Sequence, residues 1–470
     1  MLRINLNLVV NILWLIVGLC EGSVMGQNLT KIVSNSDSKN MVKHVQQTDL
    51  LVNGVPWFDD RGKIVNAHGA CIVEEDGKYY LFGEYKTDSA NRFIGFSCYS
   101  SPDLVNWKFE RLALPPQENG LLGPGRIGER VKVMRCPSTG EYVMYMHTDD
   151  LGYTDPKIAY ATCKTINGEY EFKGAFLFNG APIQRWDMGT FQDNDGRGYL
   201  LIHHGDIYRM SADYHNADKR VATNIAGSGE SPAMFKKDGL YYLLSSNLTS
   251  WERNDNMYHT APNIAGPWTK RGLFCPKGTL TYNSQCSFVF PLVQNGDTTF
   301  IYMGDRWSFP KQGDAASQVW LPLSPKGIHL SIPNYWPVWN VKNLSTFQLA
   351  SLKEQLLKEN FASDKKGTQI DFVFQGSTKF GLIGESCPDG GYAQISILDS
   401  KGHVIHNSMV DFYSKVSDVG LRFITPKLKN QKYTLRVVVS GEQGVWTDKS
   451  NARFGSTGYW VKINKTVVFP

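Results

Sequence analysis

The chain has 470 residues, more than one hydrophobic core needs, so we expect more than one domain. Apolar residues make up 42% and charged residues 20%, which excludes a disordered chain. The formal net charge of +5 is spread along the sequence without a block of Lys or Arg, which excludes nucleic acid as a partner. The 44 glycines and 12% aromatic residues favour many short strands and an all-β fold.

Residues 1–27 predict a cleaved signal peptide. Arg3 precedes an apolar run from Leu8 to Cys20, followed by small and polar residues. The run is too short for a typical membrane span. We therefore expect a secreted or periplasmic protein. Cys20 leaves lipoprotein anchoring open, although Leu19 stands where a small residue is usual, and a membrane partner is expected only in that case.

One sequence pattern recurs along the next 300 residues: a predicted strand, a turn containing glycine, and a predicted strand with aromatic residues. Such turns tolerate the positive φ that short hairpins require. The five turns lie about 43 to 63 residues apart, a length typical of one four-stranded propeller blade. They are Asp76-Gly77, Thr139-Gly140, Asp195-Gly196, Asp238-Gly239 and Asn295-Gly296.

This spacing predicts a five-bladed β-propeller over residues 28–343. A β-sandwich with similar hairpins is the alternative, but it does not explain the near-equal spacing. In a propeller, the innermost strand of each blade precedes its first hairpin. Residues about nine to eleven positions before each turn glycine should therefore lie near the axis. Counting back gives His68, Glu129, Asp187, Glu230 and Gln285, all of them polar.

Three carboxyl groups that converge on one pocket repel each other, and partial burial raises the pKa of at least one. Glycoside hydrolysis needs such a protonated carboxyl group for the leaving oxygen, and a second group that activates water or attacks carbon. Nearby polar and aromatic residues are candidates for holding a sugar: Glu84, His68, Tyr153, Thr249, Trp251, Tyr282, Asn283 and Arg306.

At these residues the chain resembles glycoside hydrolase family 43. The similarity is strongest in Asp187-Met-Gly-Thr-Phe-Gln-Asp-Asn-Asp-Gly196 and in Glu230-Ser-Pro-Ala-Met-Phe-Lys-Lys-Asp-Gly-Leu-Tyr-Tyr242. The resemblance implies that Glu230 is the general acid, that Asp187 orients it and tunes its pKa, and that the anomeric configuration is inverted.

Most family members carry an aspartate general base in the first blade, whereas this chain has Asn66-Ala-His-Gly-Ala70 there. In lacking this aspartate the chain is similar to the branch of the family that contains exo-β-1,3-galactanases. In that branch a glutamine placed like Gln285 is proposed to handle the attacking water, while residues like Glu84, Glu129 and Tyr153 hold the terminal galactose. An amide is a weak base, so Gln285 is the first candidate and Glu129 the second.

The repeat stops after Trp339. Residues 344–366, with leucines at 349, 352, 356 and 357, favour a polar helix or linker. Alternating strands then return, which predicts an accessory β-sandwich over residues 367–470.

We therefore expect an exo-acting, inverting hydrolase that releases galactose from the β-1,3-galactan of arabinogalactan. The alternatives are a family 43 arabinofuranosidase or galactofuranosidase, and a propeller that binds glycans without cleaving them. No spacing requires a metal or cofactor, and a structural calcium ion is left open. The oligomeric state cannot be read from the sequence.

Overall fold

The computed structural model describes residues 50–469 except 228 and 449. Strands dominate the described chain, which confirms the prediction of an all-β fold. The predicted signal peptide at residues 1–27, with Cys20, lies outside the described residues. Over the part of the chain that is described, no helix has the length and apolar character that a membrane crossing requires.

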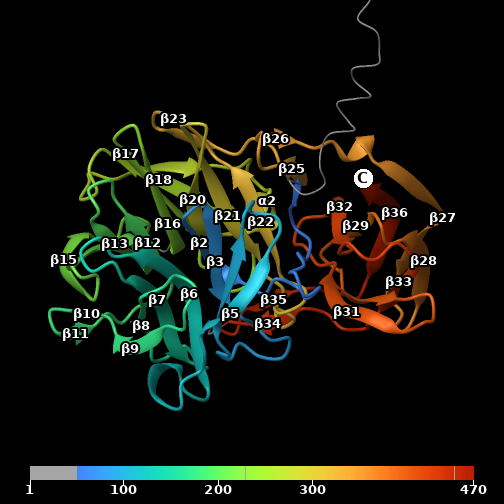
Figure 1. Ribbon diagram of the computed structural model, residues 1–470, viewed down its shortest axis with the longest axis horizontal. Coiled ribbons are helices and arrows are strands. Elements are labelled where there is room, and N and C mark those ends of the chain that lie inside the picture. The colour runs from blue at the N-terminus through green and yellow to red at the C-terminus, as the bar shows by residue number, and fades with distance from the viewer. Residues whose placement is uncertain (1–49, 228, 449, 470) are drawn as a thin grey trace, which may run out of the picture. The chain divides into compact units, whose positions relative to one another are not determined.

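Five sheets built from consecutive antiparallel strands follow each other between residues 68 and 322 (Figure 1). The third sheet is extended by β10 (Leu177–Phe178), which pairs parallel with its last strand, and by β11 (Ala181–Pro182). In chain order the sheets contain β2 (His68–Glu75), β3 (Lys78–Glu84), β4 (Phe96–Ser101) and β5 (Lys108–Leu114); β6 (Arg126–Arg135), β7 (Tyr142–Asp150), β8 (Lys157–Cys163) and β9 (Glu171–Ala175); β12 (Met188–Gln192), β13 (Gly198–Ile202), β14 (Asp206–Met210) and β15 (Asn216–Ala222); β16 (Glu230–Lys237), β17 (Leu240–Ser246), β18 (Met257–Ala261) and β19 (Thr269–Leu273); and β20 (Gln285–Gln294), β21 (Asp297–Arg306) and β22 (Ser317–Pro322).

Short elements complete this part of the chain. They are β1 (Leu50–Val52), β10 (Leu177–Phe178), β11 (Ala181–Pro182), β23 (Ser324–Lys326), β24 (His329–Ser331), β25 (Val338–Asn340), β26 (Ser345–Thr346), the helical turn α2 (Leu280–Asn283) and 3-10 turns at Gly120–Leu122, His203–Gly205 and Leu349–Ser351. The N–H of Gly54, just after β1, donates to the carbonyl of Gln318 in β22 at 2.8 Å. The beginning of the described chain therefore lies against the fifth sheet.

The glycine turns lie where the sequence predicts them, between the first two strands of each sheet. Asp238 and Gly239 illustrate why these residues are needed, because their φ values are +50° and +79°. Only residues that tolerate the left-handed region close a two-residue hairpin with the twist that the strands require.

The first strands of the five sheets pack against one another. β2 contacts β6 and β20, β12 contacts β6 and β16, and β16 contacts β20, so the five strands form a closed cycle of neighbours. Their approach is close at Gly189 in β12, where an added Cβ would lie 2.1 Å from the carbonyl oxygen of Pro232 in β16.

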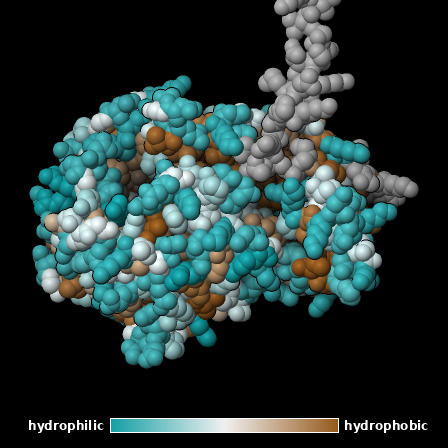
Figure 2. Space-filling view, viewed as in Figure 1, coloured by the Kyte–Doolittle hydropathy of each residue, from teal (hydrophilic) through white to brown (hydrophobic). Residues whose placement is uncertain are grey.

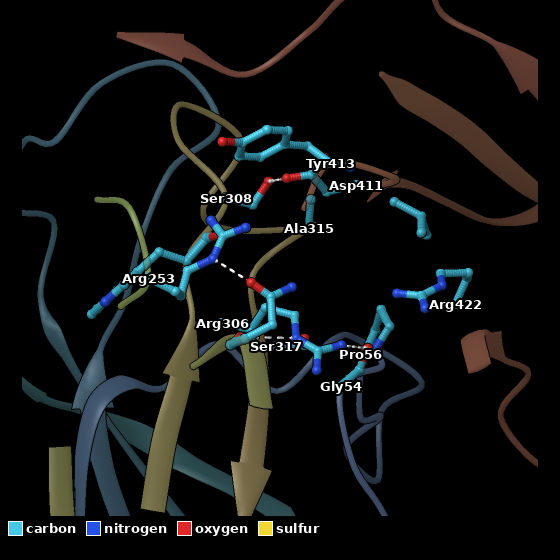
Figure 3. Close-up of a pocket in the computed structure, with 13 residues that line it drawn as sticks. Gly54, Pro56, Arg253, Arg306, Ser308, Ala315, Ser317, Asp411, Tyr413 and Arg422 are labelled. Atoms are coloured by element: carbon cyan, nitrogen blue, oxygen red, sulfur yellow. Dashed lines mark hydrogen bonds between the residues drawn. The ribbon is translucent and has the colours of Figure 1, made fainter. Parts of the chain in front are cut away.

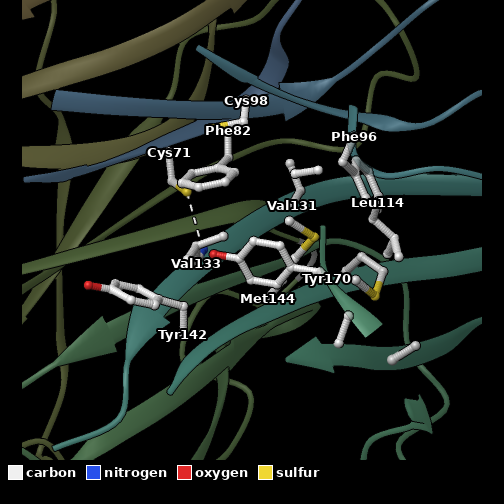
Figure 4. Close-up of a cluster of buried hydrophobic side chains, with 14 of the residues drawn as sticks. Cys71, Phe82, Phe96, Cys98, Leu114, Val131, Val133, Tyr142, Met144 and Tyr170 are labelled. Carbon is white, nitrogen blue, oxygen red and sulfur yellow. Dashed lines mark hydrogen bonds between the residues drawn. The ribbon is translucent and has the colours of Figure 1, made fainter. Parts of the chain in front are cut away.

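Apolar side chains fill the space between neighbouring sheets. In Figure 4, Cys71 and Phe82 of the first sheet meet Val133 and Met144 of the second, and all four are nearly inaccessible to solvent. The outer surface is mainly hydrophilic in Figure 2, with separate hydrophobic patches. Burial between sheets therefore supplies the main stabilising contribution.

The C-terminal part of the chain has two four-stranded sheets and a short hairpin. One sheet contains β27 (Lys353–Ser363), β36 (Val461–Phe469), β29 (Lys379–Ser386) and β32 (Asp418–Ile424); the other contains β28 (Gln369–Gln375), β33 (Lys432–Val439), β30 (Tyr392–Leu398) and β31 (Val404–Asp411); the hairpin pairs β34 (Val445–Thr447) with β35 (Arg453–Gly455). Leu382 and Phe423 from one sheet share a buried cluster with Ile395 and Leu435 from the other.

The structure corrects the prediction of a polar helix or linker over residues 344–366. Residues 353–363 of this segment form strand β27, which pairs with β36 from Lys353 opposite Val468 to Ser363 opposite Val461. Phe361 packs against the C-terminal core cluster. Pairing with a strand about 100 residues away outweighs the helical spacing of the leucines, because short apolar patterns do not distinguish the two structures. The other predicted domain boundaries stay predictions.

We expect Gly189→Ala to destabilise the protein by roughly 1–3 kcal/mol, because its Cβ would force β12 and β16 apart. Gly420→Ala is the matched control, since its Cβ would meet its nearest heavy atom only at 3.5 Å. Thermal and denaturant unfolding of both variants measure the difference. Equal melting temperatures for the two variants would contradict close packing of the inner strands.

Candidate functional site

The five polar residues identified by counting back from the hairpins lie at or near the beginnings of the inner strands. His68, Glu230 and Gln285 begin β2, β16 and β20, and Asp187 directly precedes β12. Glu129 lies in β6. Because these strands form a closed cycle of neighbours, the five side chains start from one region of the fold.

A backbone irregularity follows three of these positions. The strand registers shift after His68, Glu129 and Glu230. The next residues, Gly69, Arg130 and Ser231, have φ values of +55°, +56° and +53°. Bulges of this kind redirect side chains next to binding sites.

Glu230 has the properties of a proton donor. Gln285 donates from Nε2 to Glu230 Oε1 at 2.8 Å. Burial raises the pKa of Glu230 well above its usual range, and the negative charge of Asp187 raises it further, while Arg130 opposes both effects. Glu230 is partly exposed, so an incoming group can reach it. The raised pKa favours the protonated form that a proton donor needs.

The pKa of Asp187 is shifted in the opposite direction. Burial acts to raise its pKa, but the positive charge of Arg130 outweighs burial and the pKa is lowered. Arg130 Nη2 lies 2.9 Å from Asp187 Oδ2, and Ser231 Oγ donates to the same oxygen at 2.8 Å. Two neighbouring carboxyl groups with separated pKa values provide one acid and one stabilising carboxylate.

The amide of Gln285 is fully hydrogen-bonded. Its Oε1 accepts from Arg130 Nη2 at 2.7 Å and from Trp307 Nε1 at 2.8 Å. Its Nε2 donates to Glu230 and, at 2.9 Å, to Ser246 Oγ. Because Arg130 and Trp307 are both donors, they fix the side on which the amide oxygen lies.

Glu129 is a well-paired carboxylate. Burial opposes ionisation, but the charge of Lys86 and a hydrogen bond from His147 lower its pKa strongly. Its Oε1 accepts from Asn91 Nδ2 at 2.7 Å and from the hydroxyl of Tyr153 at 2.8 Å. His147 Nδ1 lies 3.3 Å from Oε2.

Glu84 completes the group of carboxyls. Its Oε1 accepts from the main-chain N–H of Arg130 at 2.8 Å, and its Oε2 lies 2.6 Å from Lys86 Nζ. Burial raises its pKa, and the charge of Lys86 opposes that effect. Gly69 is needed beside it, because a Cβ there would lie 2.0 Å from Glu84 Oε1.

Glu129, His147 and Asp187 each offer one ligand atom, and these atoms lie within 4.8 Å of one another, as in a metal site. Burial opposes protonation of His147, but hydrogen bonds to Asp149 and Glu129 raise its pKa to about 9. A metal ion would have to displace the proton from this imidazole, so binding there would release a proton. Without an ion, His147 lies beside the carboxylates of Glu129 and Asp149.

Three of the other predicted sugar-binding residues, Trp251, His68 and Thr249, differ in their surroundings. Trp251 lies near the carboxyl groups, because Lys86 Nζ is 5.4 Å from the centroid of its ring. His68 is buried, with its ring 6.0 Å from that of Trp307. Thr249 turns its hydroxyl towards the carbonyl of Glu252 at 2.6 Å, within its own loop.

Tyr282, Asn283 and Arg306 are occupied by contacts within the protein. The hydroxyl of Tyr282 donates to the carbonyl of Ile332 at 2.9 Å. Asn283 Oδ1 accepts from Arg253 at 2.8 Å. Arg306 donates to the carbonyls of Asn283, Gly54 and Tyr282. The structure does not bring these three side chains onto the carboxyl groups, and their role in sugar binding stays a prediction.

Sequence reasoning missed Arg130, Lys86 and His147, the cations of the site. Arg130 follows Glu129, and Lys86 lies two residues after Glu84. In the sequence, the signal for both Arg130 and Lys86 was a cation next to or near a candidate carboxylate. His147 lies opposite Glu129 in the β6–β7 pairing, and only the strand register reveals it.

The model of the family named glycosyl hydrolases family 43 matches residues 64–274. No curated protein matches the chain. A Bifidobacterium bifidum structure, described as a candidate exo-β-1,3-galactanase, is 36% identical, with a TM-score of 0.56 over 60% of this chain and 95% of that chain.

The exo-β-1,3-galactanase of Phanerochaete chrysosporium, solved with β-1,3-galactotriose, is 26% identical, with a TM-score of 0.66 over 90% of this chain and 100% of that chain. A family 43 β-1,3-galactosidase is 28% identical, with a TM-score of 0.55 over 62% of this chain and 100% of that chain.

Neighbouring carboxyl groups whose pKa values are shifted in opposite directions, and an all-β fold, agree with these similarities. The chain is a glycoside hydrolase and belongs to family 43, in the branch that contains the exo-β-1,3-galactanases.

Proposed function

We propose that this glycoside hydrolase is an inverting, exo-acting enzyme that releases galactose from the β-1,3-galactan of arabinogalactan. One observation carries the proposal: the carboxyl group of Glu230, whose pKa is raised, lies within hydrogen-bond distance of Gln285. His68 begins β2 in the part of the chain where the family resemblance leads us to expect an aspartate base. Solved structures of β-1,3-galactan and β-1,3-galactoside hydrolases resemble the chain.

The fold proposed for this function is a five-bladed β-propeller followed by an accessory β-sandwich. The five sheets are the blades, and β2, β6, β12, β16 and β20 are their inner strands around the axis. The two C-terminal sheets form the sandwich. In this arrangement the groups at the strand ends surround one pocket on the axis, where a terminal sugar would bind.

In the proposed reaction Glu230 donates its proton to the glycosidic oxygen as the bond to the anomeric carbon breaks. Asp187 stays ionised, and its negative charge holds the proton on Glu230 until the leaving oxygen takes it. A water attacks the opposite face of the sugar, which inverts the configuration.

Gln285 is the group proposed to position this water. Glu129 is the second candidate, but its strongly lowered pKa makes it a weak base. Gln285 has its four hydrogen-bonding positions occupied, so it must release the hydrogen bond to Glu230 or to Ser246 to hold water. The leaving group's approach to Glu230 would compete for that first bond.

Glu84, Glu129 and Tyr153 are proposed to hold the hydroxyl groups of the terminal galactose. Carboxylates accept from hydroxyls and form charge-assisted hydrogen bonds. In the free protein Asn91 binds Glu129 Oε1 and Lys86 binds Glu84 Oε2. Sugar hydroxyls would replace these contacts. The reaction needs neither a metal nor a cofactor. We propose that the protein acts after secretion.

We expect the protein to release galactose from β-1,3-galactobiose and no sugar from aryl arabinofuranosides or aryl galactofuranosides. Proton NMR should show α-galactose as the first product. Glu230→Gln keeps the size of the side chain but removes the proton donor, and should slow release by about 10²- to 10⁴-fold. Arabinose or galactofuranose release would replace the proposed substrate, and binding without any release would indicate a glycan-binding protein.

The pH profile tests the assignment of Glu230. A general acid must be protonated, so kcat/KM should fall as the pH rises through the raised pKa of Glu230. Asp187→Asn removes a negative charge that raises this pKa and leaves Arg130 to lower it, so the alkaline limb should move down by about one unit or more. An alkaline limb unchanged in Asp187→Asn would contradict the coupling of the two groups.

Substitutions at the two candidate base positions distinguish their roles. We expect Gln285→Ala to lower kcat by roughly 10²-fold or more, the effect of losing a group that orients the nucleophile. Gln285→Glu places a carboxylate beside Glu230 and should change the pH profile. Glu129→Gln should mainly raise KM. Near-wild-type turnover by Gln285→Ala would remove Gln285 from the mechanism, and a large loss of kcat in Glu129→Gln alone would assign the water to Glu129.

A further inference from the structure

The segment just before Gln285 has an unusual backbone. Leu280, Thr281, Tyr282 and Asn283 have φ values of +53°, +52°, +55° and +56°. Residues other than glycine lose about 1–2 kcal/mol each in this conformation. Such a run persists only when surrounding contacts hold it. The position of Gln285, two residues further on, therefore depends on groups outside its own strand.

Arg253 is the group that links this segment to Gln285. Its Nε donates to Asn283 Oδ1 at 2.8 Å, and its Nη1 donates to the carbonyl of Trp307 at 2.9 Å. Trp307 in turn donates from Nε1 to Gln285 Oε1. One buried guanidinium thus holds both the strained segment and the indole that contacts the amide of Gln285.

The C-terminal part of the chain completes the surroundings of Arg253. The hydroxyl of Tyr413 donates to Glu252 Oε2, and Glu252 Oε1 lies 3.9 Å from Arg253 Nε. The guanidinium carbon of Arg253 is 5.4 Å from the centroid of the Tyr413 ring. Beside this contact, Ser308, which follows Trp307, donates to Asp411 Oδ2 at 2.8 Å. Figure 3 shows Asp411 and Tyr413 in the same pocket as Arg253 and Ser308.

We infer that Tyr413 is a positioning residue for Gln285: by binding Glu252 it holds Arg253, and through Arg253 the strained segment and Trp307. The C-terminal part is then a component of the catalytic unit and not only an accessory domain. The inference rests on the proposed function in one respect, the role of Gln285 in turnover.

The test is a double-mutant cycle with Tyr413→Phe and Gln285→Ala in the full chain. Tyr413→Phe removes one hydrogen bond to a buried charge, and should lower kcat on β-1,3-galactobiose roughly tenfold while KM changes less than about twofold. In the Gln285→Ala background the same substitution should change the residual rate by less than about twofold, because the group it positions is absent. Tyr433→Phe is the control, since Tyr433 is 5% exposed against 6% for Tyr413, and its hydroxyl forms no hydrogen bond with another described residue.

Equal loss of kcat from Tyr413→Phe in both backgrounds would overturn the inference, because general destabilisation acts regardless of Gln285. Wild-type kcat in Tyr413→Phe would also overturn it. If the wild-type protein cleaves no galactoside, the proposed function fails, and crystal structures decide the inference separately. An unchanged Trp307 contact to Gln285 and an unchanged backbone at residues 280–283 in Tyr413→Phe would then refute it.

Discussion

The ion pair between Arg130 and Asp187 is the contact on which the rest of the site depends. Arg130 binds the carboxylate of Asp187, the amide oxygen of Gln285 and, through its main-chain N–H, the carboxyl group of Glu84. Several buried carboxyl groups close together would repel each other without this charge. Arg130 lowers the pKa of Asp187, and the negative charge of Asp187 helps to raise the pKa of Glu230, which is the separation that the proposed general acid requires.

The fold creates this site by bringing together strand ends that are far apart in the sequence. Each inner strand contributes one polar residue, and the bulges after His68, Glu129 and Glu230 turn the next residue out of the regular strand direction. Arg130 occupies one of these turned positions, which explains how its side chain reaches Asp187 and Gln285 while Glu129 beside it faces Tyr153.

Counting back from the hairpin glycines found His68, Glu129, Asp187, Glu230 and Gln285 because turn and strand length fix where a strand starts. The direction of a side chain after a bulge has no such local signal, so the role of Arg130 could not be predicted. The same limit applies to Tyr282, whose left-handed backbone directs its hydroxyl to Ile332. Strand β27 was missed for a third reason, since its partner β36 lies about 100 residues away.

Gln285 shows how far a functional position can depend on contacts that the sequence does not reveal. Its strand begins directly after a left-handed segment that is unfavourable by itself, so local preferences would not keep it in place. The contacts that hold the segment come from Arg253, in the loop between β17 and β18, and from Arg306, at the end of β21. The carboxyl group of Glu252 beside Arg253 is bound by Tyr413, which lies just after β31. A weakly basic amide needs accurate placement more than a strong base does, because positioning is the larger part of what it contributes. The extended contacts around Gln285 are therefore consistent with a site in which accurate placement of the amide replaces part of the base strength that an aspartate would supply.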